Sequence, residues 1–251
     1  MIRLPISPSS AESYAQCPRR YALEHYDTPS TFQEPLHTGN ALHRTFKHWV
    51  DEKTRTGTWL ELAEISSVLS SYLRDFDTNK PRPNRTELEF LHGNWLEDGI
   101  YKLESFMRNV QNLIDTATVI DTERWVKLDL LDTNHTVRAT GKVDLIIQVG
   151  TEIWIIDFKT GKVKNALEHS YPLALYTATA RLEYPDNVVR TFEAYLEPYQ
   201  LLEYNTEHLE SDLEALANIT QTAFVDSVFP MHPSGLCAWC EFYAICHQYL
   251  N

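Results

Sequence analysis

The spacing of hydrophobic residues changes about half way along the chain. Up to about residue 118, apolar residues recur three and four positions apart, as on one face of a helix. The clearest case is the set Leu42, Phe46, Trp49 and Val50. This spacing predicts helices over about residues 41–53, 60–75 and 94–115.

Shorter elements are predicted near the N-terminus from helix-start signals. Ser9 and Glu12 fit a capping box at the start of a first helix. Pro18 fits the first turn of a second helix that extends to about Tyr26. The Pro-rich residues 81–84 indicate a loop.

From about residue 119 to residue 200 the pattern favours strands. Apolar and polar residues alternate from Trp125 to Leu131, and residues 132–134 read as a turn. A second strand is predicted over residues 137–149. After a tight turn at residues 150–151, a third strand covers residues 152–159.

The third strand is predicted to be central, because its residues 153–156 form a continuous apolar run. A helix over about residues 165–183 and a fourth strand over residues 188–196 follow. The order is therefore ββ-β-α-β in a mixed α/β fold. A last helix over residues 207–225 precedes a cysteine-bearing tail from Pro230.

Composition is that of a globular protein. Of the 251 residues, 43% are hydrophobic and 23% are charged. This size suits a single domain over residues 1–251, with a helical region (1–118), an αβ core (119–200) and a helix with the tail (201–251). The net charge of −13 argues against a large basic surface, although a phosphate-binding groove needs only local positive charge.

The chain has no apolar run of the roughly 20 residues that span a membrane, and its first residues lack a signal-peptide layout. We therefore expect a cytoplasmic protein with no membrane partner. In a reducing compartment, four cysteines suit metal ligation better than disulfides.

Three charged residues are predicted to converge at the ends of the second and third strands. Asp157 and Lys159 share one face of a strand by period-two alternation, and a hairpin can bring Asp144 beside them. Carboxylate oxygens suit Mg²⁺ or Mn²⁺, which can activate water, and a nearby lysine can stabilise negative charge in a transition state. The alternative is a solvated Asp–Lys salt bridge.

All four cysteines fall into one pattern. Cys237, Cys240 and Cys246 have the spacing C-x₂-C-x₅-C, and Cys17 lies over two hundred residues upstream. Such thiolates suit an iron–sulfur cluster or Zn²⁺ that would join the two ends of the chain. The alternative is a set of unrelated buried thiols.

The segment Gly141–Asp144, followed by Asp157-Phe158-Lys159-Thr160-Gly161, resembles the RecB-type branch of the PD-(D/E)XK nucleases. The resemblance implies a restriction-endonuclease-like core, metal binding by Asp144 and Asp157, and a catalytic Lys159. It also implies that His43, in the G-x-x-x-H context of Gly39 to His43, is a metal ligand. The alternative for His43 is an ordinary helix residue.

Further residues follow from the same resemblance. Glu123, on the first strand, is a candidate to complete the acidic site, with a solvated carboxylate as the alternative. Tyr176 is a candidate nucleic-acid contact, with helix packing as the alternative. Pro172 stands where the family usually has a glutamine and offers no side-chain hydrogen bond, so nucleic-acid positioning or activity is expected to differ.

The cysteines are similar to those of iron–sulfur RecB-type nucleases, including the AddB nuclease domain and single-domain CRISPR-associated nucleases. Cys17, followed by Pro-Arg-Arg-Tyr, matches those families, and they bind [4Fe–4S]. The resemblance therefore favours [4Fe–4S] over Zn²⁺, which spacing alone does not decide.

Two functions remain open at this point. The first is a Mg²⁺- or Mn²⁺-dependent DNA nuclease, an exonuclease on single strands or ends, in DNA repair, recombination or CRISPR adaptation. The second is a catalytically weak DNA-binding or assembly module of the same fold that works with a helicase or integrase.

Overall fold

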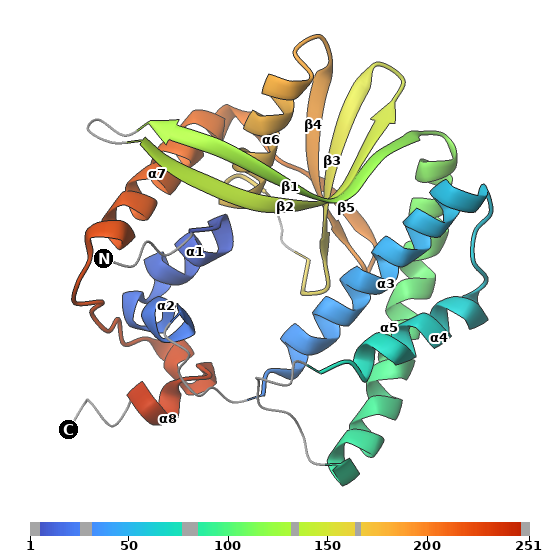
Figure 1. Ribbon diagram of the computed structural model, residues 1–251, viewed down its shortest axis with the longest axis horizontal. Coiled ribbons are helices and arrows are strands. Elements are labelled where there is room, and N and C mark those ends of the chain that lie inside the picture. The colour runs from blue at the N-terminus through green and yellow to red at the C-terminus, as the bar shows by residue number, and fades with distance from the viewer. Residues whose placement is uncertain (1–5, 26–31, 77–84, 132–135, 164–166, 247–251) are drawn as a thin grey trace.

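The computed structural model describes residues 6–25, 32–76, 85–131, 136–163 and 167–246. In this part of the chain, a mixed five-stranded sheet has helices on both faces (Figure 1). The strands, which lie in the order β1-β2-β3-β4-β5, are β1 (Thr118–Leu131), β2 (Thr136–Val149), β3 (Glu152–Lys159), β4 (Val188–Tyr195) and β5 (Gln200–Glu203).

The predicted mixed α/β fold and the order ββ-β-α-β are confirmed. The strand β3 is central, with antiparallel β2 on one side and parallel β4 on the other. The parallel pair is joined by the helix α6 (Tyr171–Glu183), as a crossover connection requires. The edge strand β5 was not predicted, because four residues are too few to show a period.

The first two strands form a hairpin that extends beyond the rest of the sheet. They pair from Thr118↔Gln148 to Leu131↔Thr136, whereas β3 pairs only with residues 145–149 of β2. Among the described residues, therefore, no third strand lies beside the outer part of this hairpin, residues 124–131 and 136–143 (Figure 1).

The helices form two layers. One face of the sheet packs on α3 (Glu34–Thr56), α4 (Leu62–Leu73) and α5 (Arg85–Asp115). The other face packs on α1 (Pro8–Gln16), α6 and α7 (Leu209–Val225), with α2 (Pro18–His25) beside α1. The tail contains the 3₁₀ segment η2 (Gly235–Trp239) and the short helix α8 (Tyr243–Cys246), and η1 (Thr206–His208) precedes α7.

Alternation along the strands sorts side chains into two cores. In β3, Ile153 and Ile155 pack with α6 and α7, while Ile156 and Phe158 pack with the layer that contains α3 and α5. The catalytic candidates Asp157 and Lys159 lie at the end of β3. No helix in the described stretches is long and apolar enough to cross a membrane.

Four predicted helix starts are wrong. The helices predicted from residues 41 and 94 begin earlier, at Glu34 and Arg85. The first helix begins at Pro8, because Ser7 accepts a hydrogen bond from the backbone of Ser10 and takes the capping role predicted for Ser9 and Glu12. The helix predicted from residue 165 begins at Tyr171, capped by Ser170. The predicted loop at residues 81–84 and turn at residues 132–134 lie outside the described residues.

Candidate functional site

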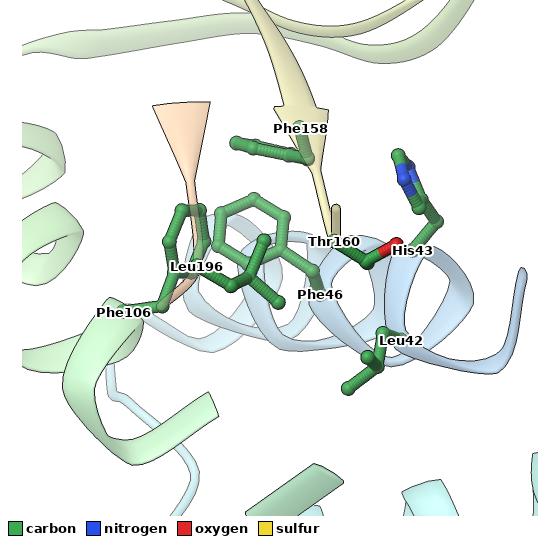
Figure 2. Close-up of a pocket in the computed structure, with 7 residues that line it drawn as sticks. All are labelled: Leu42, His43, Phe46, Phe106, Phe158, Thr160 and Leu196. Atoms are coloured by element: carbon green, nitrogen blue, oxygen red, sulfur yellow. The ribbon is translucent and has the colours of Figure 1, made fainter. Parts of the chain in front are cut away.

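The predicted site residues come together from three elements. Asp144 lies in β2, Asp157 and Lys159 lie at the end of β3, and His43 comes from α3. Figure 2 shows His43 beside the end of β3, close to Thr160, with Phe158 on the strand above. A small, largely apolar pocket adjoins this point, and its lining residues are Leu42, His43, Phe46, Phe106, Phe158, Thr160 and Leu196.

Asp144 is held by two hydrogen bonds. The backbone N–H of Phe158 donates to its Oδ2 atom at 2.8 Å, and the His43 ring pairs through Nδ1 with its Oδ1 atom at 3.2 Å. Burial opposes a charge on His43, but this bond and the charges of Asp144 and Asp157 outweigh it and raise the pKa of His43. The Asp144 carboxylate therefore joins β3 to α3.

Asp157 is only 7% exposed, and its Oδ2 atom is buried without a regular hydrogen bond. That oxygen forms an ion pair with the ammonium group of Lys159. Burial and the nearby Asp144 charge raise the pKa of Asp157 to about 6, although Lys159 acts in the opposite direction. A buried carboxylate of this kind favours a cation beside it.

Lys159 faces a second buried carboxylate that the sequence reasoning missed. Glu193, in β4, is directly opposite Asp157 in the sheet and is 2% exposed. Its Oε1 atom lies 3.8 Å from Lys159 Nζ, and its Oε2 atom accepts a 2.5 Å hydrogen bond from Tyr195. The signal in the sequence was a carboxylate inside the apolar run Phe192-Glu193-Ala194-Tyr195.

Lys159 is charged over the whole physiological range. Burial opposes the charge, but the carboxylates of Asp157, Glu193 and Asp144 outweigh it and raise the pKa of Lys159. The ammonium group is thus a fixed cation at the end of β3.

Two glycines in the motifs permit close contacts between elements. A Cβ atom on Gly39 would lie 3.2 Å from the Thr160 hydroxyl, so Gly39 lets α3 approach the end of β3. A Cβ atom on Gly141 would lie 2.7 Å from the Tyr176 ring and 3.2 Å from Leu175, so Gly141 lets β2 approach α6.

We expect Gly141→Ala to lower the free energy of unfolding by about 1–3 kcal/mol, because the methyl group must displace buried α6 side chains. Thermal unfolding followed by circular dichroism measures the change. Gly93→Ala is the matched control, since nothing lies within 4 Å of its added Cβ and alanine favours the helix. Equal melting temperatures for Gly141→Ala and wild type would contradict this packing account.

The structure places Tyr176 in the interior, with 6% of its surface exposed. Its hydroxyl group donates to the backbone carbonyl of Lys142 at 2.9 Å, so it helps to hold β2 against α6. Contact between Tyr176 and nucleic acid stays a prediction. Pro172 lies in the first turn of α6, a position that needs no backbone N–H.

Glu123 lies across from Asp144 in the hairpin, between the pairs Thr122↔Leu145 and Arg124↔Val143. Its φ of 51° is unusual for a non-glycine residue and marks local strain in β1. Its carboxylate forms an ion pair with Lys142, in which Oε1 lies 2.9 Å from the lysine Nζ atom. Glu123 therefore flanks Asp144 in the sheet.

The C-terminal tail lies against the N-terminal helices (Figure 1). The backbone N–H of Arg19 donates to the carbonyl of Pro230 at 3.1 Å, and the Arg20 side chain pairs with Glu241 at 3.3 Å. The two ends of the chain are thus in contact through ordinary protein interactions.

The four cysteines lie in this contact as half-buried free thiols. Burial raises the pKa of the Cys246 thiol, and the nearby Cys17 and Cys240 thiols add to the effect. Throughout the described ranges, however, no three His, Cys, Asp or Glu side chains lie close enough together to hold a metal ion.

Comparison with known proteins gives one family. The family model described as "PD-(D/E)XK nuclease superfamily" matches residues 5–247. No curated protein matches significantly.

Two solved structures illustrate the similarity. "Crystal structure of SSO0001" is 18% identical, with a TM-score of 0.36, over 82% of this chain and 84% of that one. Protein VC1899 from Vibrio cholerae is 17% identical, with a TM-score of 0.25, over 87% of this chain and 57% of that one. Both TM-scores are too low for either structure to inform the site.

Proposed function

Because this chain belongs to the PD-(D/E)XK nuclease superfamily, we propose that it is a metal-dependent DNA nuclease of the RecB-type branch. The observation that carries the proposal is the convergence of Asp144, Asp157 and Lys159, with His43, at the end of β3. Burying two carboxylates there is costly for folding, and a catalytic cation would offset that cost.

The donor set fits a hard divalent cation. Asp144 and Asp157 supply carboxylate oxygens, including the buried Oδ2 atom of Asp157, and His43 supplies an imidazole nitrogen. Mg²⁺ or Mn²⁺ bound there would neutralise phosphate charge and make water more acidic. Since Lys159 contacts Asp157 directly, and His43, Asp144 and Asp157 are not yet close enough together to hold a metal ion, cation binding requires the ammonium group to move away and the three ligand side chains to rotate.

The residues of the chain then have separate roles. Lys159 presents a permanent positive charge that donates hydrogen bonds to phosphate oxygens and to the attacking water. Glu193 holds the lysine at the end of β3, so it is a positioning residue. The Phe158 N–H and His43 fix the orientation of Asp144, and Glu123 adds negative charge beside it.

The proposed substrate is DNA. We propose that the protein acts on it as an exonuclease, at single strands or at ends. The resemblance to AddB and to CRISPR-associated nucleases supports DNA repair, recombination or CRISPR adaptation as the setting, with a helicase or integrase as the partner.

Hydrolysis of end-labelled oligonucleotides tests this function. Single-stranded and duplex DNA are incubated with the anaerobically purified protein and Mg²⁺, Mn²⁺ or a chelator. We expect products with either metal, released stepwise from single-stranded ends, and none with the chelator. The absence of cleavage with every metal and substrate would contradict the nuclease function.

One observation favours a second candidate, a catalytically weak DNA-binding or assembly module. Pro172 occupies the first turn of α6, where the family usually has a glutamine, and it offers no hydrogen-bond donor to a substrate. DNA binding with no metal-dependent cleavage would support this candidate.

We also propose that Cys17, Cys237, Cys240 and Cys246 hold a structural [4Fe–4S] cluster, with Zn²⁺ as the alternative. Their chemistry and their mutual proximity support this assignment. Because no three of these thiols are close enough to hold a metal as the structure stands, cluster binding requires side-chain rotation in the tail.

We expect Cys240→Ser to lose most of the bound iron and sulfide and to lower the melting temperature by several degrees, because the cluster would tie the tail to α1 and α2. Visible absorbance and metal analysis of anaerobically purified protein measure the loss. Met231→Leu, which alters the sulfur neighbour of Cys246, is the control. Colourless wild-type protein with stoichiometric zinc would contradict the iron–sulfur assignment.

A further inference from the structure

Trp125 has an exposed side chain in the middle of a strand. It is 67% exposed, whereas Trp49 and Trp95 are 1% and 5% exposed in the core. No ring or cation–π contact joins its indole to another described residue. The indole therefore offers a flat, accessible aromatic face on which a ligand can stack.

Trp125 belongs to the outer face of the β1–β2 hairpin. The alternate residues Val126, Leu128 and Leu130 pack into the core with α1, α6 and α7. The outer face is formed by three cross-strand pairs, which are Trp125↔Lys142, Lys127↔Thr140 and Asp129↔Arg138. The side chains of Trp125, Lys127 and Asp129 are exposed on this face.

Positive charge lies beside the indole despite the net charge of −13. Lys142 is directly across from Trp125 and is bound by Glu123. Lys127 is exposed one pair further along and forms no ion pair with a described residue. An aromatic ring flanked by lysines is the combination that binds single-stranded nucleic acid, through base stacking and phosphate contacts.

The outer face begins beside Asp144. Lys142 and Asp144 are two residues apart on β2, about 7 Å along the strand. The alternation of faces is interrupted between them, because Val143 and Leu145 pack in opposite cores. Glu123, which lies across from Asp144 and has a φ of 51°, forms an ion pair with Lys142 and so links the two positions. A nucleotide stacked on Trp125 would therefore lie next to the nucleotide whose phosphate reaches Asp144.

We propose that the outer face of the β1–β2 hairpin is a binding platform for single-stranded DNA, with Trp125 as its stacking residue and Lys127 and Lys142 as phosphate contacts. This inference rests on the proposed nuclease function and specifies its substrate. A flat indole stacks on a base whose face is free, and in a duplex both faces of an interior base are covered by its neighbours. The platform thus selects single strands over duplex.

Binding without cleavage tests the platform. Fluorescence anisotropy of a labelled oligothymidylate is measured with the full chain, without divalent cations, for wild type, Trp125→Ala, Trp125→Phe and Tyr101→Ala. Tyr101 is a matched control, because it is 61% exposed and lies on α5. We expect Trp125→Ala to weaken binding about 5- to 100-fold, Trp125→Phe to stay within about threefold, and Tyr101→Ala to match wild type.

The same binding measurement tests the phosphate contacts. It also distinguishes a failure of the platform from a failure of the nuclease function. Lys127→Gln should reduce the slope of log affinity against log salt concentration by about the amount that one phosphate contact contributes. Unchanged affinity for Trp125→Ala, or an equal loss for blunt duplex, would overturn the platform and leave metal-dependent cleavage by wild type unaffected. The platform would also be overturned if light scattering showed a wild-type dimer that Trp125→Ala dissociates while its affinity for the oligonucleotide is unchanged. Binding through Trp125 in a protein that cleaves nothing would instead retain the platform and overturn the nuclease function.

Discussion

Replacing Lys159 by alanine should lower the rate of metal-dependent DNA hydrolysis by about 10²- to 10³-fold. The substitution removes a fixed cation that Asp157 and Glu193 hold at the end of β3, and so removes charge stabilisation of the transition state. Initial rates on an end-labelled single strand at saturating Mn²⁺ measure the effect. Affinity for DNA in the absence of cations should change far less than the rate.

Lys102→Ala is the matched control for this experiment. Lys102 lies on α5, where it pairs with Asp98 on the surface, so its loss should leave the rate unchanged. A Lys159→Ala protein that is folded and cleaves DNA within about threefold of wild type would exclude Lys159 from catalysis.

Asp157→Asn should abolish cleavage and, at the same time, make the metal-free protein more stable. Burial holds the folded-state pKa of Asp157 at about 6, well above the ordinary value for an aspartate. The folded state therefore binds this proton more tightly, and ionisation of Asp157 lowers stability as the pH rises through 6. An amide removes that cost, so the gain should be on the order of 1–3 kcal/mol at pH 8 and should vanish below pH 4.

Thermal melting of the metal-free proteins between pH 4 and pH 8 measures this difference. Asp98→Asn, which alters an exposed carboxylate, should show no such pH-dependent gain. Mn²⁺ should raise the melting temperature of wild type and leave Asp157→Asn nearly unchanged, because a ligand stabilises only the state that binds it. A less stable Asp157→Asn protein at pH 8 would contradict the idea that this carboxylate is costly without a cation.

The regular strands could be predicted because burial imposes a recognisable spacing of apolar residues along them. The strand β3 was predicted with its observed bounds, since its apolar run is bounded by a turn at Gly150 and by the charged motif that ends at Lys159. The convergence of Asp144, Asp157 and Lys159 also follows from hairpin geometry. These features depend on contacts that are close in sequence.

Features that depend on distant contacts were missed. Glu193 reaches Lys159 only because β4 pairs with β3 in parallel register, which no local pattern reveals. The exposure of Trp125 depends on which elements pack against the hairpin, and no local pattern reveals that either. Helix starts at Pro8 and Tyr171 depended on which of several adjacent polar residues caps the helix, and capping differs by only about 1 kcal/mol between such residues.

The spacing of the cysteines predicted that the two ends of the chain meet, and the tail does lie against α1 and α2. What the spacing could not indicate is how much of this contact is made by other residues, such as Arg20 with Glu241 and Tyr14 with Asp226. The cluster is therefore proposed to reinforce an existing contact.

The central claim is that Asp144 and Asp157 hold the catalytic cation. Crystals of the protein soaked in Mn²⁺, with diffraction data collected at a wavelength that gives a manganese anomalous signal, test it most directly. We predict a single strong peak between the two carboxylates, beside His43, with Lys159 moved away from Asp157. A protein that cleaves DNA in Mn²⁺ but shows its manganese peak elsewhere, with the Asp157–Lys159 pair intact, would contradict the account.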